Sequence, residues 1–170
     1  MPGTDSAFRL TEPSLIELAS ARLKLRQAAW GPEGEPMSLD TIQCLACGLQ
    51  ADVTVDFSAL GRGTVFPAST GRVLLNVLML AADSLPEGGS IVLAGAADDL
   101  FVQIAGPGAG WPFELTLCIA NQTAARAALT NARTWQMALT ALFALAASIR
   151  FSVLLSPTAR TDPAILRLGG

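Results

Sequence analysis

One apolar segment constrains the fold of this 170-residue chain more than any other feature. Residues 72–85 are apolar almost all round, and the turn sequence Pro86-Glu-Gly-Gly89 ends them. A helix of this composition has no polar face for water, so it must be buried on most of its sides. We therefore expect a central helix over residues 72–85. Its buried side chains should be Val73, Leu74, Val77, Leu78 and Leu80.

Segments typical of strands and helices surround this central helix. Alternating or short apolar runs predict strands at about residues 53–57, 90–94, 100–104, 150–155 and 164–168. Apolar residues at helical spacing predict further helices at about residues 12–30, 39–49, 112–120 and 131–148. This order of elements predicts an α/β fold, an α+β two-layer sandwich in which helices cover one face of a mixed sheet of about five strands.

A short linker divides the chain into two parts. Residues 31–37 hold two glycines and two prolines among polar side chains, a composition typical of loops. We expect an N-terminal helical segment over residues 1–36 and an α/β domain over residues 37–170.

Missing residue types exclude several kinds of active site. The sequence contains no histidine, and Lys24 is its only lysine. A Ser-His-Asp triad, a Cys-His pair and a histidine-ligated metal site are therefore impossible, and no P-loop lysine follows a glycine loop. We predict no catalytic, metal-binding or cofactor-binding residues and no catalytic activity in this chain. The net charge of −3 argues against binding to nucleic acid.

The three cysteines, Cys44, Cys47 and Cys118, form no disulfide framework. Cys44 and Cys47 make a C-x-x-C pair inside an apolar helical pattern, so we expect buried structural thiols. An odd, small number of cysteines is typical of a reducing compartment. No apolar segment reaches the roughly 18 residues of a membrane span, and the polar N-terminus is unlike a signal peptide. We expect a cytoplasmic protein that does not enter a membrane.

Two segments carry a resemblance to a known fold. Residues 74–89, followed by a strand, resemble the N-box helix of the histidine-kinase-type, or Bergerat-type, ATP-binding fold, and Gly106-Pro-Gly108 resembles its next glycine motif. From about residue 12 onward the chain is similar to the ChpT-like bacterial histidine phosphotransferases of two-component phosphorelays. In that family a two-helix hairpin precedes a degenerate ATPase-like domain. Residues 21–31 resemble the end of the second hairpin helix, and residues 129–136 resemble the start of a late helix.

Two positions depart from the ATP-binding pattern. The resemblance places the magnesium-holding asparagine at Leu80 and the adenine-binding aspartate at Ile104. An aliphatic side chain can neither coordinate a metal ion nor accept a hydrogen bond. Asn76 and Asp83 remain polar, but we expect Asn76 to make an internal hydrogen bond. We predict a degenerate ATPase domain that binds no ATP and no other cofactor.

The resemblance implies phosphoryl transfer through a histidine on the first hairpin helix, and this sequence has no such residue. Our first hypothesis is a non-catalytic family member that binds a response-regulator receiver domain or a histidine-containing relative, and that forms a homodimer through its first helix. The candidate docking residues are Leu15, Leu18, Arg22, Leu25 and Arg26. Alternatively, their apolar members only pack on the domain.

Two further hypotheses stay open. The chain could be a truncated form of an active histidine phosphotransferase whose acceptor helix lies upstream. It could also be a small ATP-binding enzyme of the kinase fold, although Leu80 and Ile104 argue against this.

Overall fold

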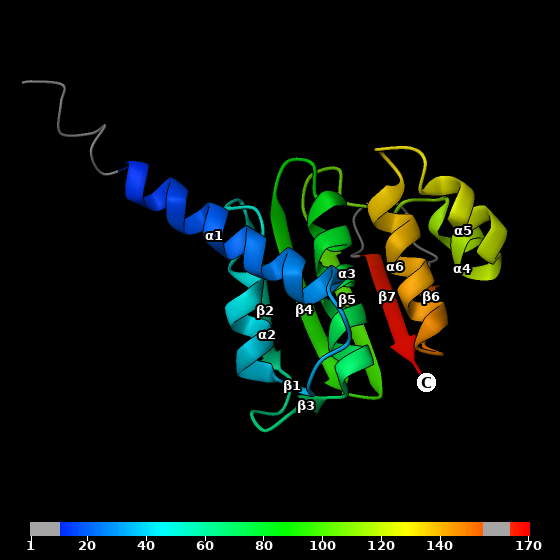
Figure 1. Ribbon diagram of the computed structural model, residues 1–170, viewed down its shortest axis with the longest axis horizontal. Coiled ribbons are helices and arrows are strands. Elements are labelled where there is room, and N and C mark those ends of the chain that lie inside the picture. Colours follow the sequence, from blue (N-terminus) through cyan, green and yellow to red (C-terminus); the bar gives the residue numbers. More distant parts are fainter. Residues whose placement is uncertain (1–10, 155–163) are drawn as a thin grey trace, which may run out of the picture.

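A five-stranded mixed sheet forms one layer of the structure, and helices form the other (Figure 1). The structure is a computed structural model that describes residues 11–154 and 164–170, with side chains from Leu15 onward. The strands are β2 (Val53–Ala59), β4 (Gly89–Ala96), β5 (Asp99–Ala105), β6 (Arg150–Leu154) and β7 (Ala164–Gly169). Their order is β2-β4-β5-β7-β6, with β2 parallel to β4 and all other pairs antiparallel. The predicted α/β fold with about five strands is confirmed.

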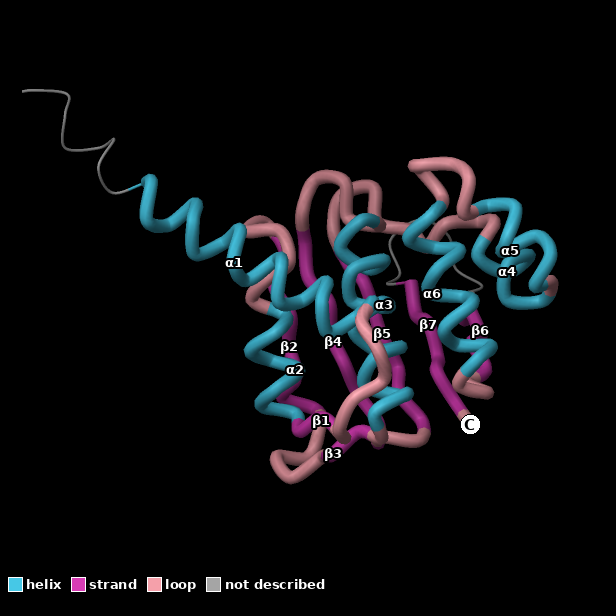
Figure 2. The backbone as a smooth tube through the Cα atoms, in the orientation of Figure 1, coloured by secondary structure: helices cyan, strands magenta, loops and turns pink. Residues whose placement is uncertain are grey.

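Three helices lie over one face of this sheet (Figure 2). The helices are α1 (Thr11–Trp30), α2 (Leu39–Ala46), α3 (Ala68–Asp83), α4 (Leu115–Ala120), α5 (Gln122–Ala128) and α6 (Trp135–Ala146). Helices α2, α3 and α6 cover the sheet, while α4 and α5 lie beyond α6 at the β6 edge. A small antiparallel ribbon joins β1 (Met37–Ser38) to β3 (Val65–Phe66). Within residues 11–154 and 164–170, no helix is both long and apolar enough to cross a membrane.

Helix α3 is the centre of the hydrophobic core. Its five predicted core residues are at most 2% exposed, so this prediction is confirmed. The helix begins at Ala68, four residues earlier than expected, because the Gly71 N–H donates to the Pro67 carbonyl and closes an additional first turn.

The turn after α3 and the glycine loop after β5 contact each other. Gly88 has a φ of 77°, and a Cβ there would lie 2.7 Å from the carbonyl oxygen of Asp52. A Cβ on Gly106 would lie 2.5 Å from the carbonyl oxygen of Gly88. Both positions need glycine, because only a residue without a side chain allows these backbones to approach so closely.

The region after the glycine loop differs from the expected arrangement. The sequence predicts one helix over residues 112–120 and one over 131–148, but the structure has three shorter helices between residues 115 and 146. Asn121 separates α4 from α5 and caps α5. Its Oδ1 accepts hydrogen bonds from the N–H groups of Thr123 at 2.9 Å and Ala124 at 3.2 Å. Helix α5 is rich in alanine and has no apolar periodicity, so the sequence pattern did not reveal it.

The expected burial of the C-x-x-C pair is wrong. Cys44 and Cys47 are exposed, whereas Cys118 on α4 is buried. Helix α2 turns Leu39, Ile42 and Ala46 toward the core, which places both thiols of the pair outside it.

The boundary between the two predicted parts of the chain stays a prediction. Residues 1–10 of the N-terminal segment and Leu155 of the predicted strand lie outside the described residues. Leu25 and Ala29 of α1 join the hydrophobic core of the α/β domain. The C-terminal end of α1 therefore packs as part of that domain.

Candidate functional site

Helix α1 has a projecting half and a packed half (Figure 1). In the projecting half, residues 15–20, all side chains are exposed except that of Leu18, which is half-buried. In the packed half, residues 21–30, Leu25 is 2% exposed and Ala29 is fully buried. Gly48, after α2, meets the backbone of Ala21, and α1 also packs against α3. The surface of α1 thus extends from the domain as a partly uncovered helix.

Four of the five predicted docking residues lie together on this surface. Leu15, Leu18, Arg22 and Arg26 line a shallow groove along α1, together with Ala19 and Leu23. Leu25 differs from the other four, because its side chain is 2% exposed and packs in the hydrophobic core instead of standing on the open surface of α1. The sequence spacing did not separate the face that meets α3 from the face that stays open.

The apolar members of this surface form one stripe. Leu15, Leu18, Ala19 and Leu23 stand at positions i, i+3, i+4 and i+8, which fall on one side of a helix. Leu15 is 64% exposed and Leu23 is 57% exposed. We call these four residues the apolar stripe.

A second groove lies at the packed half of α1. It has a volume of about 480 Å³ and is bounded by α1, the turn after α2, the end of α3 and the start of α6. Its lining includes Arg22, Arg26 and Trp30 of α1, Gln50, Asp83, Trp135 and Gln136. We call it the basic groove. Sequence analysis found its two arginines but not its other walls, which come from elements far apart in the chain.

The arginines of the basic groove are available to a ligand. The Arg26 guanidinium carbon lies 5.6 Å from the centre of the Trp30 ring, and the rings of Trp30 and Trp135 are 4.8 Å apart. Among the described residues, the one ion pair shorter than 4.0 Å joins Arg167 to Asp99 on the sheet. Neither Arg22 nor Arg26 is therefore held in an ion pair with a described acidic residue. Residues 15–30 carry three basic side chains and one acidic one, a net charge of +2, whereas the whole chain carries −3.

Asp83 is the acidic group of the basic groove. Partial removal from water raises the pKa of this carboxyl, and the charge of Arg26 offsets part of that rise. The side chain is nevertheless exposed on its outer side, at the C-terminal end of α3. Its charge is therefore unfavourable to the folded state, and it opposes the approach of an anionic partner.

Asn76 holds the packed half of α1 against α3 and α6. This side chain is fully buried. Its Nδ2 donates to the carbonyl oxygens of Ala29 and Arg72, both at 2.9 Å. Its Oδ1 accepts the indole N–H of Trp30 at 3.1 Å and the amide of Gln136 at 3.3 Å. The expected internal role of Asn76 is confirmed, with several hydrogen bonds in place of one.

The two positions that depart from the ATP-binding pattern lie in the core. Leu80 is 2% exposed and Ile104 is fully buried. Leu115 and Cys118 of α4 belong to the same hydrophobic cluster. Among the described residues, no three acidic or cysteine side chains gather closely enough to hold a metal ion.

Comparison with known proteins gives a family and a fold. Residues 39–159 match the family model described as the histidine phosphotransferase C-terminal domain. The structure of a bacterial phosphotransferase is similar, with a TM-score of 0.64 and 19% identity over 91% of this chain and 77% of that chain. The mycobacterial sensor histidine kinase MprB has a TM-score of 0.51 and 19% identity, over 79% of this chain and 94% of that chain. No curated protein matched the sequence.

Proposed function

The chain belongs to the ChpT-like histidine phosphotransferase family of two-component signalling, and we propose that it acts there as a non-catalytic, partner-binding member. The observation that carries this proposal is the open surface of α1, where a basic groove and an apolar stripe adjoin each other. The two surfaces differ in chemistry, so we assign each of them one partner.

The basic groove is proposed to bind a response-regulator receiver domain. A receiver domain gathers acidic side chains around its phosphorylation site, and Arg22 and Arg26 stand one helical turn apart at the edge of the groove. Guanidinium groups bind carboxylates with charge-assisted, often bidentate hydrogen bonds. The net charge of +2 on residues 15–30 also favours the approach of an acidic partner to this side of an acidic chain.

The apolar stripe is proposed to pair with a second copy of this chain. Its spacing suits the close packing of two helices, and no element within the described residues covers Leu15 or Leu23. A two-fold contact would bury the same stripe from both copies, which is the commonest way in which a soluble chain covers such a surface. The protein would then present two basic grooves per dimer.

The non-catalytic part of the proposal is supported by two positions and by one missing residue type. Leu80 and Ile104, which the resemblance places where the related fold holds magnesium and adenine, are buried aliphatic side chains. The sequence supplies no histidine to accept a phosphoryl group. We propose that the α/β domain serves as a scaffold for α1, without bound ATP.

Receiver binding is tested by titration of purified receiver domains into the protein, followed by tryptophan fluorescence. Trp30 and Trp135 line the basic groove, so occupation of the groove should change their emission. The double variant Arg22→Glu, Arg26→Glu should raise the dissociation constant by about tenfold or more. This is the change expected because one to two charge-assisted hydrogen bonds are lost.

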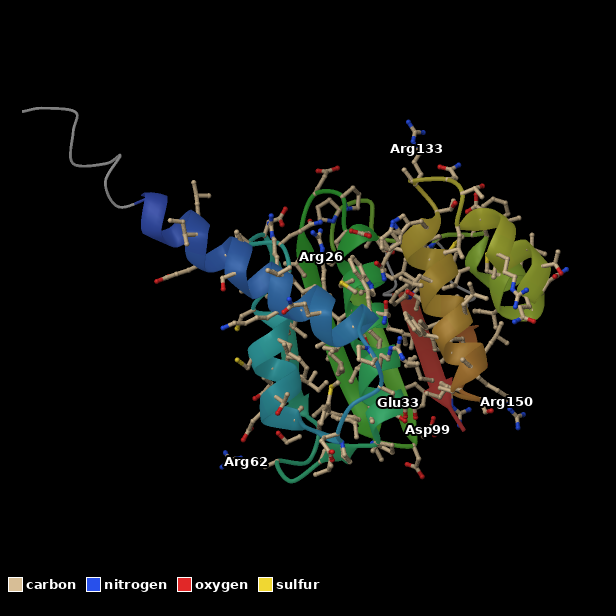
Figure 3. All side chains as sticks on the ribbon, in the orientation of Figure 1. Arg26, Glu33, Arg62, Asp99, Arg133 and Arg150 are labelled. Carbon is tan, nitrogen blue, oxygen red and sulfur yellow. The ribbon has the colours of Figure 1, made fainter. Side chains whose placement is uncertain are left out.

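The matched control changes the same charges elsewhere. Arg62 and Arg150 are exposed, and Figure 3 shows both of them apart from Arg26, Arg62 at the lower left and Arg150 at the lower right of the view. The double variant Arg62→Glu, Arg150→Glu should bind as the wild type does. Absence of binding by every receiver domain, or equal weakening in both double variants, would refute this assignment.

The second-copy contact is tested by light scattering after size exclusion. Leu15→Glu with Leu23→Glu should convert dimers to monomers without unfolding the domain, because both leucines are exposed. The control Leu117→Glu with Leu154→Glu changes two exposed leucines away from α1 and should leave the dimer intact. A wild-type protein that stays monomeric at high concentration would show that the stripe does not pair.

A further inference from the structure

Two cysteines of a C-x-x-C pair lie at the end of α2, outside the basic groove and the apolar stripe. Cys44 and Cys47 are both exposed with free thiols, in contrast to the buried Cys118. Cys47 is the C-cap of α2, and Cys44 stands one turn before it. Exposed thiols are accessible to oxidants, whereas a buried structural thiol is not, so these two cysteines are candidates for redox chemistry.

The backbone brings the two cysteines onto the same side of one tight turn. The Cys47 N–H donates to the Cys44 carbonyl at 3.3 Å, and the next two residues repeat this i to i−3 pattern at 3.0 Å each. Side chains three residues apart eclipse each other in such a 3₁₀ turn. The rise of about 2.0 Å per residue in a 3₁₀ turn places their Cα atoms about 6 Å apart, inside the range of about 4.4–6.8 Å found in disulfides.

We propose that Cys44 and Cys47 form a redox-active dithiol that takes a small-molecule disulfide as its oxidant, with glutathione disulfide as the probe. One thiolate attacks a sulfur of glutathione disulfide, forms a mixed disulfide and releases one glutathione thiolate. The second thiolate then attacks the protein sulfur of that mixed disulfide and releases the other glutathione. The protein loses two electrons and two protons, and glutathione disulfide is reduced to two glutathione molecules.

The position of this dithiol couples it to α1. Gly48 follows Cys47 directly, and a Cβ on Gly48 would lie 2.5 Å from the carbonyl oxygen of Ala21. A helical turn holds the Cβ atoms of such a pair about 5–6 Å apart, whereas a disulfide needs about 3.5–4.5 Å. Disulfide closure must therefore tighten the turn, and we expect this to alter the close contact between Gly48 and the backbone of Ala21. Gly48 and Gln50 also line the basic groove, so the consequence for partner binding rests on the proposed function.

Intact-mass analysis of the whole chain in glutathione buffers tests the dithiol. The wild type and Cys118→Ala should lose two hydrogens on oxidation and retain no glutathione. Cys44→Ser and Cys47→Ser should each retain one glutathione on the remaining thiol of the pair, because no second thiol resolves the mixed disulfide. Two retained glutathiones on Cys44 and Cys47 of the wild type, a disulfide-linked dimer, or an unchanged mass would each overturn the proposal.

Hydrogen exchange tests the coupling to α1 separately. Amides of residues 21–30 should exchange faster in the oxidised protein than in the reduced protein, and Cys44→Ser should show no such difference. Equal exchange in the two wild-type states would overturn the coupling. Neither measurement uses a receiver domain, so a failure of the proposed function would be seen independently, in the fluorescence titration.

Discussion

Replacement of Asn76 by alanine is expected to release the packed half of α1 from the domain. This one side chain joins α1 to α3 and α6 through hydrogen bonds at both ends of its amide. Alanine leaves the Trp30 indole N–H and the Ala29 carbonyl without these partners. The hydrophobic contacts of Leu25 and Ala29 would remain, so α1 should loosen before the sheet unfolds.

The size of the effect follows from what the variant leaves unpaired. A buried donor or acceptor without a partner costs about 1–3 kcal/mol. Two factors reduce the cost here: the Nε of Arg72 still lies 3.4 Å from the Ala29 carbonyl, and Trp30 is only half-buried beside the basic groove. We expect the free energy of unfolding to fall by about 2–4 kcal/mol for the pair of groups.

Urea unfolding measures this loss, and hydrogen exchange shows where the structure opens. Asn76→Ala should speed exchange in residues 21–30 and leave β4 and β5 protected. Asn121→Ala is the matched control, because it removes only the cap of α5 and should cost about 1 kcal/mol without an effect on α1. The reasoning is refuted if Asn76→Ala costs no more than Asn121→Ala and α1 exchanges at its wild-type rate.

Two further substitutions test the core and the charge of Asp83. Leu80→Asn places an unpaired amide in the core and should lower the free energy of unfolding by about 2–4 kcal/mol, against less than about 1.5 kcal/mol for Leu80→Met. Calorimetry with magnesium and ATP should give no saturable heat for the wild type or Leu80→Asn, and micromolar binding by either would contradict the proposed scaffold role. Asp83→Asn should stabilise the protein at pH 7, because the pKa of Asp83 is raised in the folded state. The wild-type protein therefore loses stability as the pH rises from the unfolded-state pKa of about 3.8 through the folded-state pKa, and the loss persists at higher pH. Urea titrations should show this gain vanish below that window, and a gain that grows with acidity would contradict the sign.

The central elements of the fold could be predicted because their sequence patterns are strong. The apolar run around Val77 can only be a buried helix, and the alternation from residue 53 to 57 marks a strand with one covered face. The burial of Leu25 and the exposure of Cys44 escaped the sequence pattern for one shared reason. The pattern of a helix shows which residues share a face, but the neighbouring helices decide which face is buried.

The basic groove could be predicted only in part. The sequence pattern shows Arg22 and Arg26 as basic residues of one helix. Asp83 and Trp135 line the same groove from α3 and α6, which lie much later in the sequence. Helix α5 escaped prediction because alanine supplies helix propensity without an apolar face. Its one local signal is the capping residue Asn121.

The docking of a receiver domain in the basic groove is tested most directly by hydrogen exchange of the complex. A receiver domain that binds should slow exchange in residues 22–30 of α1 and at the start of α6, around Trp135 and Gln136. The exposed surface of α4 near Phe113 should exchange as in the free protein. Protection confined to α4, or an α1 that exchanges equally with and without the receiver domain, would contradict the proposed docking surface.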